Sequence, residues 1–291
     1  MSNTIPELDM QRVNALIELA LSEDLGDRGD TTSISVIGSQ ARAKGVLYAK
    51  CDCVIAGLAV AEAVFKKLDP ECEFKYILHD GDHCPNKTVI AEITGNAVAM
   101  LTAERTALNF IQRLCGVATM AAAYAKSVEN SNMKVLDTRK TTPGWRNLEK
   151  YAVAVGGAAN HRIGLYDRIM IKDNHREMAG MEGPGGILRS VERARKMYPD
   201  LEIEVEVDTL EELDEALQSG CEHILLDNMS TEMMAEAVRR NQGRAKLEAS
   251  GNITIERLPE IAAAGVDFAS SGALTHSVKS SDISLDIKPL L

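Results

Sequence analysis

Arg139 and Lys140 stand next to each other in the stretch DTRKTTPG, directly after a short apolar run. A third cation, Lys172, ends the later run RIMIK, and His161 and Arg162 precede that run. Arginine binds a carboxylate through two parallel hydrogen bonds, and lysine binds it as a point charge. Taken one at a time, these residues also fit a solvated loop or a basic helix C-terminus. Together they predict a binding site for one or two carboxylates.

Acids and small residues end the later apolar runs. Glu206 lies near the end of EIEVEV, and Asp227 ends HILLD. Carboxylate oxygens suit Mg²⁺, which is held partly through water and substrate phosphates. Two Ser-Gly segments follow the last two runs, where backbone N–H groups can approach a phosphate closely. These segments consist of Ser250, Gly251, Asn252, Ser271, Gly272 and Ala273.

All these residues follow apolar runs that alternate with helical patterns from about residue 133 onward. This alternation predicts a parallel sheet, either a barrel or an open doubly wound sheet. In EIEVEV the glutamates share one face, which fits poorly in a sheet covered by helices on both sides and therefore favours a barrel. We interpret Glu202 and Glu204 as features of a solvated or water-filled barrel rather than as ligands. Because barrel active sites lie at the C-terminal strand ends, we expect one mouth for a carboxylated substrate, a metal-bound polyphosphate and a sugar phosphate. The runs are KVLD, RIMIK, EIEVEV, HILLD, KLEAS and VDFAS.

The first third of the chain shows a mixed α+β pattern. Val13, Ile17 and Leu21 belong to one apolar face at helical spacing, which predicts an early helix. Apolar and β-branched runs separated by turn residues predict strands in the segments that follow. We expect strands at residues 42–50, 72–78 and 88–101, the last broken near Gly95, and a long helix at about 102–128. The turn-rich residues 79–87 lie between two of these strands and predict a hairpin.

Composition excludes several classes of partner. The 291 residues carry a formal net charge of -11, which disfavours binding to nucleic acid or to an anionic membrane surface. No apolar run reaches the roughly 18 residues of a membrane span, and the start MSNTIPELDM does not resemble a signal peptide. The six cysteines form no CxxC pair, so we expect reduced thiols and a cytoplasmic location.

The chain resembles the quinolinate phosphoribosyltransferase family through long motifs that occur along nearly its whole length. The resemblance implies an α/β protein with two domains, an N-terminal α/β sandwich and an incomplete, seven-stranded α/β barrel. The sandwich would comprise residues 1–117 and a returning C-terminal strand at 280–291, and the barrel residues 118–279. The motifs are EDLGDRGDTTS, ERTALNFIQRLCGVAT, DTRKTTPG, NHRIGLYDRIMIKDNH, EVEVD, LLDN, SGNI and SSGALTHS.

The resemblance also implies an activity. Such an enzyme transfers the phosphoribosyl group of phosphoribosyl pyrophosphate to quinolinate with decarboxylation. The products are nicotinate mononucleotide, CO₂ and pyrophosphate, in the de novo synthesis of NAD. Mg²⁺ would be needed and no organic cofactor, and the protein would be a homodimer or a multiple of dimers.

Residue roles follow from the same resemblance. The quinolinate pocket would be lined by Arg139, Lys140, His161, Arg162 and Lys172, and Arg105 would enter it from the partner subunit. Thr138 would also bind substrate. Glu206 and Asp227 would serve the ribose and Mg²⁺. The two Ser-Gly segments, Ser250 to Asn252 and Ser271 to Ala273, would hold the 5-phosphate. The candidates for catalysis are Lys140, Lys172, Glu206 and Asp227.

Two other classes of protein remain open at this point. An aldolase-like barrel would use Lys172 or Lys140 as a Schiff-base nucleophile, although the acidic pair Glu206 and Asp227 argues against it. A non-catalytic relative that serves metal or metabolite transport is the second alternative. The complete set of cations argues against that class.

Overall fold

The computed structural model describes residues 5–290, which form two compact units. One unit contains residues 5–122, Thr142–Gly157 and 277–290, and we call it the sheet unit. The other contains Ala123–Thr141 and Ala158–His276, and we call it the barrel unit. Within the described residues, none of the helices is both long enough and apolar enough to cross a membrane.

The sheet unit is built on a four-stranded antiparallel sheet in the order β12-β1-β5-β3. The C-terminal strand pairs with β1 along its whole length, with Ile283 opposite Ala49 and Leu290 opposite Arg42. The predicted return of the chain's last strand to the first part of the fold is therefore confirmed. The strands of this unit are β1 (Arg42–Ala49), β2 (Cys53–Val54), β3 (Glu73–Tyr76), β4 (His83–Cys84), β5 (Val89–Asn96) and β12 (Ile283–Leu290).

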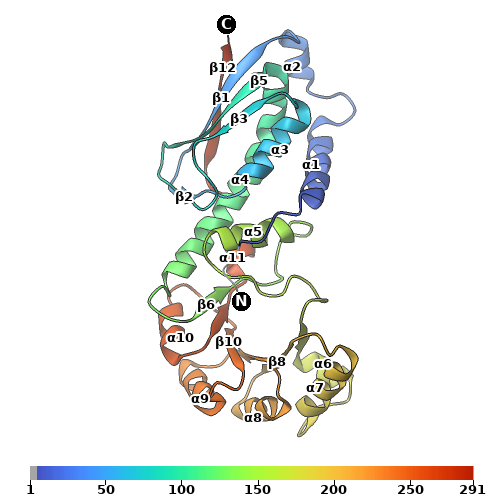
Figure 1. Cartoon of the computed structure of the whole chain (residues 1–291), viewed down its shortest axis with the longest axis vertical. Helices are drawn as coiled ribbons and strands as arrows, with labels where there is room; N and C mark the ends of the chain where they lie inside the picture. Colours follow the sequence, from blue (N-terminus) through green and yellow to red (C-terminus); the bar gives the residue numbers. More distant parts are fainter. Residues whose placement is uncertain (1–4, 291) are drawn as a thin grey trace. The chain divides into compact units, whose positions relative to one another are not determined.

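Helices cover one face of this sheet, where α3 and α4 run beside the strands (Figure 1). The predicted early helix is confirmed, with Val13, Ile17 and Leu21 on its buried face. Phe65 of α3 packs against Phe74 of β3, with ring centroids 6.1 Å apart. The helices are α1 (Met10–Leu25), α2 (Thr31–Val36), α3 (Leu58–Leu68), α5 (Arg146–Val155) and α4 (Ala97–Lys126), whose last residues belong to the barrel unit.

One local prediction in this unit is wrong. The strand expected at 88–101, with a break near Gly95, does not continue after that break: it ends at Asn96, because the Asn96 Oδ1 accepts the Ala99 N–H at 3.0 Å and starts α4 at Ala97. The predicted hairpin is confirmed, since β3 and β5, on either side of residues 79–87, pair antiparallel with each other. Within that connection the short strand β4 pairs with β2.

The barrel unit contains six parallel strands in the order β6-β11-β10-β9-β8-β7. The pairing of β6 with β11 joins the first strand to the last, and an isolated parallel bridge from Leu136 to Ala159 adds a seventh position beside β6. Among the described residues no ladder joins Ala159 to β7, so the barrel is incomplete, as predicted. The strands are β6 (Lys134–Leu136), β7 (Ile169–Ile171), β8 (Ile203–Val207), β9 (His223–Asp227), β10 (Lys246–Ser250) and β11 (Phe268–Ser270).

Helices lie on the outside of the strands (Figure 1). Thr209 accepts the Glu212 N–H at 3.1 Å and caps α8, and Gly220 ends that helix with φ of 68°. In β8, Val205 is buried on one face, while Glu204 and Glu206 occupy the other. The helices are α6 (Asp173–Met178), α7 (Gly186–Met197), α8 (Leu210–Ser219), α9 (Thr231–Asn241), α10 (Leu258–Ala264) and α11 (Ala273–His276).

Candidate active site

The carboxyl ends of the barrel strands surround a pocket of about 340 Å³. It brings together the cations that the sequence predicts for a carboxylate site, apart from Arg105, which lies on α4 in the sheet unit. The predicted site residues that line the pocket are Thr138, Arg139, Lys140, His161, Arg162, Lys172 and Ser250.

Lys172 and Glu206 form an ion pair at the mouth of this pocket. They follow or end adjacent parallel strands, where Ile171 of β7 stands opposite Val205 of β8, so their side chains emerge next to each other. Burial raises the pKa of Glu206 despite the opposing effect of Lys172, and the nearby Asp227 adds to the rise. A further cation near Glu206 would therefore stabilise its ionised form.

Arg162 is the most buried of the pocket's guanidinium groups. Its Nη1 donates to the Arg168 carbonyl oxygen at 2.9 Å, and its Nη2 lies 3.6 Å from the Met170 sulfur. Burial, followed by repulsion from Arg139, lowers the pKa of Arg162. Two guanidinium groups that repel each other in a partly desolvated pocket favour an anion between them.

The first Ser-Gly segment is locked against the end of β9. Gly251 has φ of +90°, and a Cβ atom there would lie 2.1 Å from the Asn228 Oδ1. Asn228 in turn donates through Nδ2 to Asp227 at 2.8 Å and through its backbone N–H to the Ser250 carbonyl at 3.0 Å. Only glycine fits this position, and without a side chain its backbone can be approached closely by neighbouring groups.

The second Ser-Gly segment lies beside the cationic stretch after β6. A Cβ atom on Gly272 would lie 3.0 Å from the Lys140 Cδ, so the backbone of Gly272 passes close to that side chain. Ser271 is buried and donates its hydroxyl to the Ile253 carbonyl at 3.1 Å. Its hydroxyl therefore holds two late loops together rather than facing open space. Ala273 begins α11.

Comparisons with known proteins decide the family. Two family models match adjoining parts of the chain: "Quinolinate phosphoribosyl transferase, N-terminal domain" over residues 30–115 and "Quinolinate phosphoribosyl transferase, C-terminal domain" over residues 117–286. The chain belongs to the quinolinate phosphoribosyltransferase family. Its activity is that of this family, phosphoribosyl transfer to quinolinate in NAD biosynthesis.

Relatives and solved structures agree over almost the full length. The chain is 44% identical over 268 residues to the probable carboxylating nicotinate-nucleotide pyrophosphorylase of Bacillus subtilis, covering 91% of this chain and 90% of that one. It is 42% identical over 291 residues to a chloroplastic relative from Oryza sativa, covering 94% and 77%. NadC from Streptococcus pyogenes superimposes with a TM-score of 0.93 at 39% identity, covering 98% and 99%. The Francisella tularensis pyrophosphorylase gives 0.92 at 36%, covering 99% and 100%. These matches confirm the predicted family and α/β fold, and they remove the aldolase-like and non-catalytic alternatives.

The pocket at the strand ends also contains residues that the sequence motifs did not predict. Met170, Leu225, Glu248 and Ser270 line it, each from the inward face of a strand. A signal was present for Glu248, because it stands two residues before Ser250 in KLEAS and therefore shares its face. A single carboxylate in a short apolar strand fits a site residue and a residue on an exposed strand edge equally well. The pattern therefore did not identify Glu248 as a site residue.

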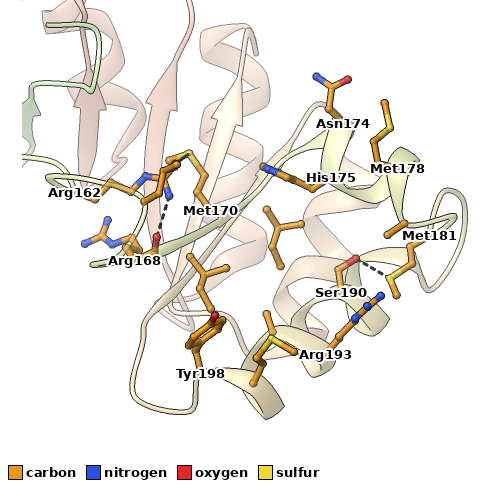
Figure 2. Close-up of a pocket in the computed structure, with 16 residues that line it drawn as sticks. Arg162, Arg168, Met170, Asn174, His175, Met178, Met181, Ser190, Arg193 and Tyr198 are labelled. Carbon is orange, nitrogen blue, oxygen red and sulfur yellow. Dashed lines mark hydrogen bonds between the residues drawn. The ribbon is translucent and has the colours of Figure 1, made fainter. Parts of the chain in front are cut away.

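A larger cavity of about 760 Å³ lies between β7 and the helices α6 and α7 (Figure 2). Arg162 and Met170 line this cavity as well as the pocket at the strand ends. Its other walls are largely apolar, with Met178 85% exposed and Tyr198 53% exposed. Because it contains neither the strand-end acids nor the Ser-Gly segments, its size does not make it the reaction site.

Proposed function

We propose that the pocket at the strand ends binds quinolinate as a dianion and that the chain converts it, with phosphoribosyl pyrophosphate, to nicotinate mononucleotide, CO₂ and pyrophosphate. The observation that carries this assignment is the convergence of Arg139, Lys140, Arg162 and Lys172 on one small pocket. Two carboxylates on neighbouring ring carbons supply the charge that these cations require. His161 and Thr138 complete the wall around the substrate.

The phosphoribosyl group belongs beside the quinolinate, toward β9, β10 and β11. Glu206 and Asp227 would serve the ribose and the metal. The 5-phosphate would take backbone N–H groups from residues 250–252 and 271–273. The close approach of Gly251 to Asn228 supports this role, because a side chain at residue 251 would obstruct a phosphate as well as Asn228.

The acids at the strand ends fit a divalent cation. Asp227 and Asp173 both raise the pKa of Glu206, and Asp227 and Glu212 do the same for Asp208 after burial. Such mutual repulsion is relieved by an ion with oxygen ligands, and Mg²⁺ commonly uses one or two carboxylates together with waters and substrate phosphates. Glu206 and Asp227 would hold it. When bound, the ion would neutralise the charge of the leaving pyrophosphate.

The chain's own part in the reaction is mainly to position and to stabilise charge. Arg139, Arg162 and Lys172 would fix the two carboxylates so that the pyridine nitrogen faces the anomeric carbon. Lys140, next to Gly272, would lie between the substrate carboxylates and the 5-phosphate site and offset negative charge from both. The positively charged ring formed by the transfer then draws the electrons of the breaking C2–carboxylate bond.

We further propose that the protein is a homodimer or a multiple of dimers in which Arg105 completes the partner's pocket. Two-fold dimers are the commonest closed assembly, and an isologous interface would create two equal composite sites. The division at residues 1–117, 118–279 and 280–291 and a cytoplasmic location are proposed with it. The six cysteines, free in the structure, support a reducing compartment.

A comparison of two substrates tests the assignment of the pocket. Nicotinate lacks the 2-carboxylate, so it would leave buried cations unpaired. That costs about 2–5 kcal/mol, or roughly 30- to 4000-fold in kcat/KM. The Arg162→Ala variant should lose quinolinate binding in calorimetry, whereas Arg239→Ala, on an exposed side chain of α9, should not. Equal turnover of nicotinate and quinolinate by the wild-type enzyme would contradict the assignment.

A further inference from the structure

A cluster of buried ionisable groups lies beneath the pocket, inside the barrel. Barrel interiors are normally filled with branched apolar side chains. Here Glu204 is 0% exposed and Glu248 1% exposed, with His161 and Arg168 nearly as buried. Buried ionic groups contribute little net stability, because desolvation offsets their attraction. Their presence at the centre of the barrel therefore calls for a role in the reaction.

The contacts of His161 fix where its proton lies. Its Nδ1 accepts the Arg162 backbone N–H at 2.6 Å, so Nδ1 carries no proton. Its Nε2 lies 3.3 Å from a Glu204 oxygen and 3.4 Å from a Glu248 oxygen, so Nε2 holds the proton of the neutral ring and faces the two carboxyl groups. A nitrogen that carries a proton cannot ligate a metal, so the trio of Glu204, Glu248 and His161 is a proton-holding group rather than a metal site.

A second proton lies in the same trio, on Glu248. Glu204 has a cation of its own, since the Arg168 Nη1 lies 3.5 Å from its carboxylate. Glu248 has no such partner, and neither of its oxygens makes a hydrogen bond of good geometry in the structure. Burial first and the charge of Glu204 second raise the pKa of Glu248. A buried carboxyl group in this position remains the neutral acid.

The surroundings of Glu248 keep that proton in place around neutral pH. His161 faces it from the segment before β7, Glu204 from β8 and Ser270 from β11. Burial opposes charge on His161, but the two carboxyl groups outweigh it and raise the pKa of His161. Because Nδ1 accepts the Arg162 N–H, the ring has no second position for a proton, so the proton that the two carboxyl groups attract stays with Glu248. His223 of β9 stays neutral, because burial and Arg168 lower its pKa. The trio thus carries one proton more than two carboxylates and a neutral imidazole would.

Decarboxylation consumes one proton, and of the two acidic residues in the trio Glu248 is the one that lines the pocket. When the bond from C2 to its carboxylate breaks, CO₂ leaves and the electron pair stays on C2. A C2–H bond must then form. The guanidinium groups of Arg139 and Arg162 cannot supply the proton, because arginine does not deprotonate in proteins. Lys172 is engaged by Glu206, and the Lys140 side chain lies beside Gly272, on the side of the proposed 5-phosphate site.

We propose that Glu248 is the acid that protonates C2 after CO₂ leaves, with His161 and Glu204 as positioning residues. The proposal rests on the proposed binding of quinolinate in this pocket. The Glu248 O–H bond breaks as the C2–H bond forms, and Glu248 becomes a carboxylate. Solvent restores its proton through the pocket once the product leaves. His161 meanwhile orients Glu248 through Nε2 and fixes the backbone of Arg162 through Nδ1.

The source of the proton can be determined from the hydrogen isotope that is incorporated at C2. Reaction in an equal mixture of H₂O and D₂O gives nicotinate mononucleotide whose H:D ratio at C2 depends on the donor. Glu248→Gln should lower kcat by about 100- to 10,000-fold, the usual contribution of a general acid, and change the H:D ratio. The dissociation constant of quinolinate should stay within about threefold. Glu202→Gln is the matched control, because Glu202 is 57% exposed beside Arg168, outside the pocket, and should leave both quantities unchanged.

An unchanged H:D ratio in Glu248→Gln would overturn the proposal, as would full activity of that variant. Should the variant not fold, infrared spectroscopy of the wild-type enzyme replaces it: the resting enzyme should show the carbonyl stretch of one buried carboxylic acid, and its absence would reject Glu248 as the donor. Failure of the proposed function gives a different result, since the wild-type enzyme would then form no nicotinate mononucleotide from quinolinate at all.

Discussion

Adding a single methyl group at Gly251 should damage the phosphoribosyl side of the site and leave the quinolinate side intact. An alanine with φ of +90° is strained by about 1–3 kcal/mol. Its Cβ would also lie 2.1 Å from the Asn228 Oδ1, so the Asn228 side chain must move. That movement breaks the 2.8 Å hydrogen bond to Asp227, a charged acceptor, which costs about 1.5–3 kcal/mol more. The total is about 2.5–6 kcal/mol.

Steady-state kinetics and thermal unfolding separate the two parts of this cost. If the free-energy cost of breaking the hydrogen bond to Asp227 weakens substrate binding, kcat/KM for phosphoribosyl pyrophosphate should drop by roughly 10- to 150-fold, because every 1.36 kcal/mol is tenfold. The dissociation constant of quinolinate should stay within about threefold. Gly243→Ala is the matched control, since Gly243 also has a positive φ, of +77°, but its Cβ would meet nothing within 4 Å. If both variants lower the melting temperature by the same amount and neither changes the kinetics, the close approach of Gly251 to Asn228 has no role in the site.

Two further predictions concern the metal and the shared site. Glu206→Ala and Asp227→Ala should raise the Mg²⁺ concentration for half-maximal activity by about tenfold or more, the loss of one charged ligand being worth at least 1.4 kcal/mol. Quinolinate affinity, measured by calorimetry, should hold or improve in Glu206→Ala; lost affinity with an unchanged metal requirement would contradict these roles. Arg105→Ala and Lys172→Ala should each be nearly inactive, yet mixed subunits should recover about a quarter of wild-type activity, because half the dimers are hybrids with one intact site. No recovery despite subunit exchange seen by native mass spectrometry would place Arg105 outside the partner's pocket.

Most of the barrel could be predicted from the sequence, because each strand is a short apolar run whose polar end marks the same edge. Lys172 and Glu206 illustrate this. Their separate runs predicted parallel neighbours, and the structure pairs the side chains directly. The acidic face of EIEVEV also predicted a barrel interior rather than a helix-covered sheet. Such local patterns are informative because a parallel arrangement fixes the direction of each strand and the face on which each side chain lies.

Other features depended on contacts that no local pattern contains. A break near Gly95 could be predicted but the start of α4 at Ala97 could not, since the apolar residues that follow fit a strand as well as a helix, and one side-chain cap decides between them. The interpretation of Glu204 as a solvated feature is wrong, because it is fully buried against His161 and Arg168. Its burial depends on residues from distant strands that close the barrel. The place of Arg105 relative to the pocket stays a prediction.

With the proposed roles, the ion pair between Lys172 and Glu206 would link the binding of the two substrates thermodynamically. Lys172 and Glu206 neutralise each other in the structure, so a quinolinate carboxylate would compete with Glu206 for Lys172, and a metal ion would compete with Lys172 for Glu206. The first ligand to bind would separate the pair and leave the other side chain available to the second ligand. With the proposed roles, quinolinate and the metal-bound phosphoribosyl donor each strengthen the binding of the other, by equal factors in both directions. The complex with one substrate does not gain this cooperative free energy. The complex with both substrates is therefore favoured over either complex with one.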